Sequence, residues 1–129
     1  MRAYVAVTLD ELSQLLDKQS FRFETAYILT SAFAQSNPDL DEEELEFELS
    51  WMAAQGSRAG GESADSPGYV LAVDLLNAQI GQARENQVEV LSNIQWSQVE
   101  SLLVSESDES ELTWYASQEL ATYLPQWMA

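Results

Sequence analysis

The chain begins MRAYVAVTLDELSQLL (residues 1–16), a stretch that predicts a buried strand followed directly by a capped helix. Residues 1–7 are apolar on both alternating faces, a pattern typical of a strand covered on both sides. Thr8 and Glu11 have the spacing of a capping box, in which each side chain binds a free backbone N–H at the helix start. The apolar stripe of this helix consists of Leu9, Leu12, Leu15 and Leu16.

The rest of the chain alternates short strands with helices. β-branched and aromatic residues predict strands at 25–30, 69–76, 87–94 and 101–105. A helical turn or short helix is expected at 31–37, where Pro38 ends it, and a longer helix is expected from the acidic stretch to about Gln55. The segment 77–86 is a connector or a hairpin. Gly, Ser, Asp and Pro in GSRAGGESADSPG predict a mobile loop over about 56–68.

The last segment, after residue 108, has the spacing of an amphipathic helix. Asp108 can cap it, Glu111 stands at the matching capping-box position, and Pro125 ends it. Its apolar stripe consists of Leu112, Tyr115, Ala116, Leu120, Tyr123 and Leu124. The whole order predicts a single α+β domain over residues 1–129. We expect one mixed sheet of about five strands with helices mainly against one face, and a ferredoxin-like arrangement is the nearest familiar shape.

Charge and composition limit the classes of function. The chain has 22 acidic and 5 basic residues, a net charge of −17, no His and no Cys. So few basic residues disfavour direct binding to nucleic acid and to anionic membranes, and no stretch approaches the ~20 apolar residues of a membrane span. Neither a signal peptide nor a disulfide framework is apparent, so we expect a cytoplasmic protein. The charge favours a basic protein as partner.

The stretch DLDEEELEFELSW (residues 39–51) raises the question of a metal site. Asp39, Asp41 and Glu43 alternate as an EF-hand loop does, but Glu44 and Ser50 replace its required Gly and Glu. We therefore predict a helix start, with Asp39 as the cap and acids favoured by the helix dipole. Weak Mg²⁺ or Ca²⁺ binding and imitation of nucleic-acid phosphates stay open. The helix is apolar on two sides, so it lies between layers or presents one side to a partner.

Several individual residues are candidates for a role. Glu119 projects onto the predicted apolar stripe and needs a positive partner, and Arg2 is the first candidate and Arg22 the second. Trp114 points away from that stripe, beside Glu111 and Gln118, where an exposed Trp can anchor an interface. Together with Glu43 and Glu44 of the acidic stretch, these three residues form the predicted partner-binding surfaces.

No catalytic constellation is apparent. Without His or Cys there is no triad, thiolate or neutral-pH base, and the sequence contains no phosphate-binding or dinucleotide-binding glycine motif. No cofactor or metal ligand set is predicted. The best hypothesis is a non-catalytic protein-interaction module. A small-ligand or Mg²⁺/Ca²⁺-binding module comes second, and a nucleic-acid mimic or a carboxylate-based enzyme third.

Both ends of the chain resemble a family of small actinobacterial proteins of unknown function. The similarity rests on the pattern M-R-x-Y-x-x-x-T-L-x-x-L at the front and W-Y-x-x-Q-E-L near the back. These residues are Met1, Arg2, Tyr4, Thr8, Leu9 and Leu12, and then Trp114, Tyr115, Gln118, Glu119 and Leu120. The Gly-rich stretch at 56–61 departs from the family, in which the helix is expected to continue. The resemblance implies a bacterial cytoplasmic protein and supplies no activity.

Overall fold

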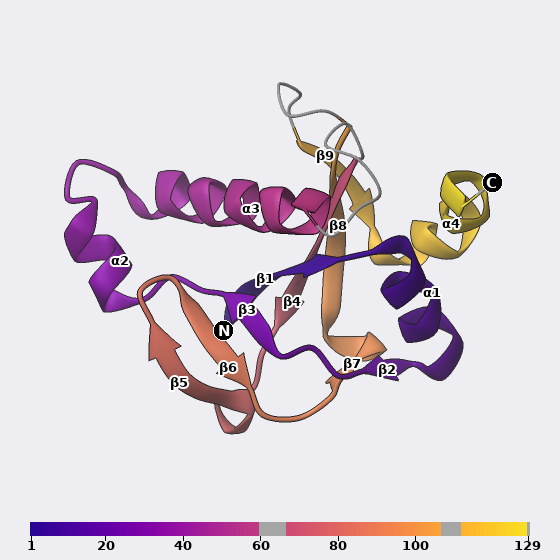
Figure 1. Cartoon of the computed structure of the whole chain (residues 1–129), viewed down its shortest axis with the longest axis horizontal. Coiled ribbons are helices and arrows are strands. Elements are labelled where there is room, and N and C mark those ends of the chain that lie inside the picture. The colour runs from indigo at the N-terminus through magenta and orange to yellow at the C-terminus, as the bar shows by residue number, and fades with distance from the viewer. Residues whose placement is uncertain (60–66, 107–111, 129) are drawn as a thin grey trace.

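An antiparallel sheet of seven strands, with β1 in its middle, organises the chain (Figure 1). The computed structural model describes residues 1–59, 67–106 and 112–128. The strand order is β5-β6-β3-β1-β4-β8-β9, formed by Ile80–Arg84, Gln87–Val90, Thr25–Tyr27, Arg2–Val7, Gly68–Asp74, Val99–Ser105 and Leu112–Ala116. A separate ladder pairs β2 (Ser20–Phe21) with β7 (Ile94–Gln95).

Helices cover both faces of the main sheet. The α-helices are α1, α2, α3 and α4, which span Leu9–Lys18, Ser31–Ser36, Glu42–Ala59 and Leu120–Met128. The short 3₁₀ helices η1, η2 and η3 span Asn77–Gln79, Trp96–Gln98 and Ser117–Glu119. In Figure 1, α1 and α4 lie together at one end of the molecule, whereas α3 crosses the sheet separately.

The strand β1 is buried from both sides, as its sequence predicts. Ala3, Val5 and Val7 point into a core that contains Leu12 of α1 and Leu120 of α4. On the opposite side, Tyr4 belongs to a second core beneath α3, with Val70, Ala72, Leu49, Ala53 and Ala54. The sheet is therefore the middle layer of three, and each of its faces has its own hydrophobic core.

Local chemistry sets the start of α1. The Glu11 backbone N–H donates to the Thr8 hydroxyl at 3.1 Å, and the Thr8 N–H donates to the Glu11 carboxylate at 2.9 Å. The predicted capping box is confirmed. At the other end, Gln19 adopts the left-handed conformation (φ 64°) that ends many helices.

Close backbone contact holds α3 on the sheet. The buried Ser57 hydroxyl accepts a hydrogen bond from the Tyr69 N–H at 2.9 Å and donates one to the Val7 carbonyl at 2.5 Å. A Cβ atom at Gly68 would collide with the Ala54 carbonyl group, whose carbon it would meet at 3.1 Å. Gly68 thus lets the C-terminal half of α3 lie directly on the start of β4.

The predicted α+β class is confirmed, but the expected arrangement differs in several respects. The sheet has seven strands rather than about five, and the strand pairs of the described residues are antiparallel rather than mixed. After β1 the chain passes along α1 and β2 and then comes back to the end at which β1 finishes. The next strand, β3, therefore runs antiparallel to β1. In a ferredoxin-like fold the two strands joined by the first helix run parallel, with a third strand between them, whereas here β3 lies directly beside β1 and antiparallel to it, so that expectation is wrong. The expectation that the helices lie mainly against one face is wrong too, because α3 covers the second face.

The predicted last helix is wrong over residues 112–116. This segment is β9, paired with β8 from Ser101↔Ala116 to Ser105↔Leu112, and α4 begins only at Leu120. The Thr-Trp-Tyr content of the segment suits a strand, and pairing with β8 outweighs the helical spacing. Pro125 lies inside α4 rather than at its end.

The expected loop over 56–68 is shorter than predicted at both ends. Helix α3 continues to Ala59, and β4 begins at Gly68. The stretch 60–66 lies outside the described residues. The segment 77–86, left open between connector and hairpin, contains η1 and then β5, which forms a hairpin with β6.

Candidate functional site

Trp114 is the most exposed of the large hydrophobic side chains on the described strands of the sheet. It lies on β9 opposite Leu103 of β8, and 61% of its surface is accessible to solvent. Along the same face, Leu103 is opposite Val70, and the neighbouring pairs Ser101↔Ala72 and Ala72↔Tyr4 lead across to β1. A hollow of about 330 Å³ lies there, lined by Arg2, Tyr4, Ala72, Glu100, Ser101, Leu103 and Trp114. We call it the Trp114 hollow.

An irregularity in β8 brings a carboxylate to this hollow. The pairing of β4 with β8 shifts between Ala72 and Val73, so that Glu100 has no partner on β4. Such a bulge redirects one side chain of a strand. The Glu100 carboxylate accepts a hydrogen bond from Arg2 Nη2 at 3.1 Å, and the two side chains are 40% and 51% exposed. The pair therefore stands in solvent at the rim of the hollow.

The predicted pairing of Arg2 with Glu119 is corrected by these contacts. Glu119 lies in η3, where its carboxylate accepts a hydrogen bond from the Ala116 N–H at 3.0 Å. Its role is to cap the turn between β9 and α4. The prediction failed because it placed residues 112–124 on one helix, which would have turned Glu119 toward the core.

Charges of both signs act on Tyr4 in the Trp114 hollow. Burial raises the pKa of the Tyr4 phenol above its ordinary value of 10.0, and the carboxylate of Glu46 on α3 raises it further. Arg2 opposes this shift, and Glu100 adds to it. Conversely, the hydrogen bond and charge of Glu100 raise the pKa of the Arg2 guanidinium. Arg2 is thus paired with Glu100, while the Glu46 carboxylate acts on Tyr4 from α3.

The acidic start of α3 forms a second hollow. The cap is Asp41 rather than the predicted Asp39: its carboxylate accepts from the Glu44 N–H at 2.8 Å. Phe47, 55% exposed, stands one turn into the helix. A hollow of about 440 Å³ beside it is lined by Leu40, Glu43, Glu44, Phe47 and Glu48. We call it the Phe47 hollow.

The two apolar sides of α3 have different surroundings. Leu45 and Leu49 are buried, and Leu49 packs in the core beneath α3, whereas Phe47 faces solvent among glutamates. Of the alternatives that the sequence left open, the first half of α3 therefore presents one side outward. The predicted residues Glu43 and Glu44 belong to this exposed surface.

The other residues of the predicted Trp114 surface do not join Trp114 on a helix face. Gln118 is exposed in η3, beyond the end of β9. Glu111 lies outside the described residues. Sequence reasoning missed Tyr4, Glu100 and the exposure of Phe47. Strand alternation could have placed Tyr4 beside Arg2 on one face, but nothing in the sequence marks the bulge at Glu100.

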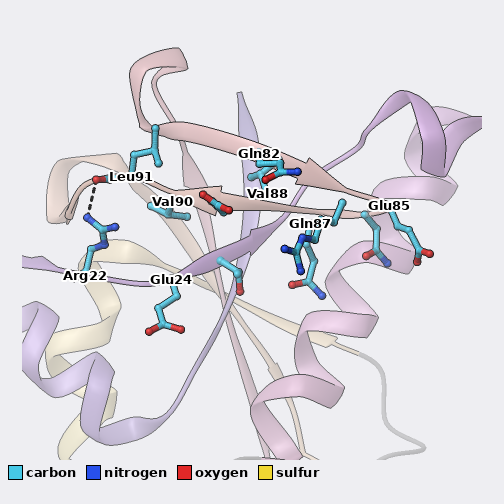
Figure 2. A pocket seen from close by; sticks show the side chains of 12 residues that line it. Arg22, Glu24, Gln82, Glu85, Gln87, Val88, Val90 and Leu91 are labelled. Carbon is cyan, nitrogen blue, oxygen red and sulfur yellow. Dashed lines mark hydrogen bonds between the residues drawn. The ribbon is translucent and has the colours of Figure 1, made fainter.

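A shallow polar groove lies along the β5–β6 hairpin and β3 (Figure 2). Its volume is about 720 Å³, larger than that of the Trp114 hollow or the Phe47 hollow. Figure 2 shows Arg22 at one end, where Nη1 donates to the Leu91 carbonyl at 2.6 Å, with Glu24 nearby. Glu85 and Gln87 lie toward the other end. Arg84 and Glu89 also line this groove, so it carries both signs of charge.

Within residues 1–59, 67–106 and 112–128, no three acidic side chains gather in a way that could hold a metal ion. None of the helices described is both long and apolar enough to cross a membrane.

Fold and surface together define an acidic α+β protein with an antiparallel sheet and two hollows in which an exposed aromatic residue lies beside carboxylates. The model of a family of unknown function (DUF6912) matches residues 1–110, and the chain belongs to this family. The front motif of the sequence resemblance lies within that match, whereas the motif at 114–120 lies beyond it. An actinobacterial origin stays a prediction. No curated protein and no solved structure matches the chain.

Proposed function

We propose that this chain is a non-catalytic interaction module of the bacterial cytoplasm that binds a basic protein. One observation carries the proposal. Phe47 and Trp114 are the aromatic residues among the large exposed hydrophobic side chains of the described part. Phe47 lines a hollow with three glutamates, and Trp114 lines one with Glu100 and its partner Arg2. Such a combination suits a partner surface that presents apolar groups together with Lys or Arg.

The Phe47 hollow supports this proposal through its charge. Glu43, Glu44 and Glu48 surround a ring that remains 55% exposed. Exposed aromatic rings become interface anchors when a partner covers them and excludes water. The carboxylates would meet the basic rim of that partner and accelerate its approach at low salt.

The Trp114 hollow supports the proposal through its shape and its charged residues. The indole can offer its face to a cation, and such contacts contribute about 0.5–1 kcal/mol at exposed positions. Leu103 and Ala72 line it with apolar groups, while the carboxylates of Glu46 and Glu100, opposed by Arg2, raise the pKa of Tyr4. The alkyl part of a lysine or arginine side chain from a partner can therefore pack on the apolar residues while its charged end lies near the carboxylates.

Affinity capture with matched variants tests the proposal. The full chain is immobilised, exposed to a lysate of the native host at low salt and eluted with a salt gradient. Phe47→Ala and Trp114→Ala columns serve as comparisons, because both substitutions keep the net charge. We expect a basic protein that leaves wild type at moderate salt and is depleted from at least one variant column. Identical retention on all columns would contradict the proposal, because it would mean attraction by charge alone.

A small polar ligand in the hairpin groove is the second candidate function. Its support is that Arg22 and Arg84, two of the 5 basic residues of the chain, line the same groove as Glu24 and Glu89. Both signs of charge within one groove suit a zwitterionic molecule such as an amino acid. A thermal-shift screen of amino acids would test it. A ligand at a hundred times its Kd should add about 2.7 kcal/mol to stability, and less in Arg84→Gln.

A further inference from the structure

The open edge of β9 offers a more specific way to bind. β9 stands at the end of the strand order, and no strand of the described residues pairs with its outer side. Its ladder with β8 is regular over five consecutive residue pairs, from Ser101↔Ala116 to Ser105↔Leu112. The strand LTWYA contains no charge, no Gly and no Pro. Proteins use such features to block unwanted pairing at sheet edges, and β9 lacks them.

The opposite edge of the sheet provides an internal contrast. β5 pairs with β6 through a register shift between Ile80 and Ala83, and it contains Gly81 and the exposed Arg84. Shifts and charges of this kind protect an edge. The two edges of the sheet therefore differ, and β9 is the one suited to accept another strand.

Charge indicates which kind of segment would pair with the open edge of β9. Glu100 lies at the Trp114 hollow, Glu119 caps the Ala116 end of β9, and Glu106 directly follows the β8 residue that pairs with Leu112. A second copy of the chain would bring two net charges of −17 together at this edge. A basic segment would instead meet a carboxylate near each end of β9 and one more at the Trp114 hollow.

We propose that β9 accepts an extended basic segment of a partner protein as an additional antiparallel or parallel strand, with a Lys or Arg of that segment on Trp114. Backbone hydrogen bonds would supply affinity, and the Trp114 hollow would select the cationic side chain. This inference rests on the proposed function and specifies the partner segment and its way of binding.

Alternate N-methylation of a probe peptide tests the pairing. The probe is a short capped peptide of alternating lysine and valine, compared with two versions that are N-methylated at the odd or at the even positions. Only one edge of an added strand faces β9, so one version should bind as the parent does. The other should bind at least about tenfold more weakly, because it loses several backbone hydrogen bonds.

Further readouts locate the peptide. Bound parent peptide should slow amide hydrogen exchange at Leu112–Ala116. Trp114→Ala should weaken binding, whereas Leu76→Ala, at a residue as exposed as Trp114 but outside both hollows, should leave it unchanged. Equal binding of both methylated versions, or no binding of the parent to wild type, would overturn the inference. A dimer of the free chain that Trp114→Ala abolishes would also overturn it in favour of self-pairing. If Phe47→Ala alone reduces binding, the edge inference fails while the proposed acidic interaction module stands.

Discussion

Gly68 provides the sharpest test of how α3 is held over the sheet. A methyl group added at residue 68 would meet the carbonyl oxygen of Ala54, its carbonyl carbon at 3.1 Å and its Cα at 3.3 Å. These are backbone atoms in the middle of a helix, so no side chain can move aside. Gly68→Ala must push α3 away from β4 or distort the start of β4.

The size of the effect follows from that geometry. Overpacking of a well-packed contact costs about 1–3 kcal/mol, which corresponds to a fall in Tm of about 3–15 °C for a chain of this length. Gly56→Ala is the matched control on α3. Its new methyl group would meet the Tyr27 hydroxyl at 3.4 Å and the Ala6 Cβ at 3.6 Å, which are ordinary contacts. Because Ala favours a helix over Gly, that variant should gain about 0.4–1 kcal/mol.

Urea unfolding and calorimetry of both variants would measure the difference. Opposite changes in the free energy of unfolding are expected for two substitutions that are chemically the same. If Gly68→Ala unfolds at the same urea concentration as wild type, or at a higher one, the backbone of α3 does not lie directly against β4. The placement of Glu46 near Tyr4 would then lose its support.

Three further predictions concern local contacts. Thr8→Ala should lower the free energy of unfolding by about 1 kcal/mol because α1 loses its capping hydroxyl, while Thr8→Ser should lose much less; equal urea midpoints for the two would contradict this. Glu119→Gln should cost under about 1 kcal/mol in the same assay, because an amide oxygen can still accept from the Ala116 N–H, whereas a larger loss would mean a buried charge. Burial raises the pKa of Tyr4 above 10.0, so the unfolded chain releases its phenolic proton first; this contribution to stability is present below about pH 10 and is lost as pH rises through the folded pKa. Tyr4→Phe should therefore flatten the fall of the urea midpoint above about pH 10, and an unchanged slope would place the phenol in solvent.

The sequence predicts well those structural features that depend on residues close together in the chain. Thr8 and Glu11 lie within one turn of each other, so their capping box is readable from spacing alone. The same is true of β1, whose alternating faces predict burial on both sides. Asp41 rather than Asp39 caps α3, an error of two residues among acids that can all serve as caps.

The features that the sequence could not supply depend on pairing between distant segments. Residues 112–116 have helical spacing, yet they form β9 because β8 offers a complete ladder of hydrogen bonds. That change moves Trp114 from a helix to a sheet edge and turns Glu119 into a cap. Glu100 reaches Arg2 only because the register of β8 shifts beside Val73. Bulges and strand order follow from long-range pairing, which no local pattern encodes.

The central claim is that the Phe47 and Trp114 hollows bind a basic protein. The most direct measurement is photo-crosslinking in the native host, with benzoylphenylalanine placed at position 47 or 114 and, as a control, at the exposed position of Gln95 on β7. The account predicts that position 114, position 47 or both crosslink to one basic protein, and that position 95 does not. The same products from all three positions, or none from positions 47 and 114, would contradict it.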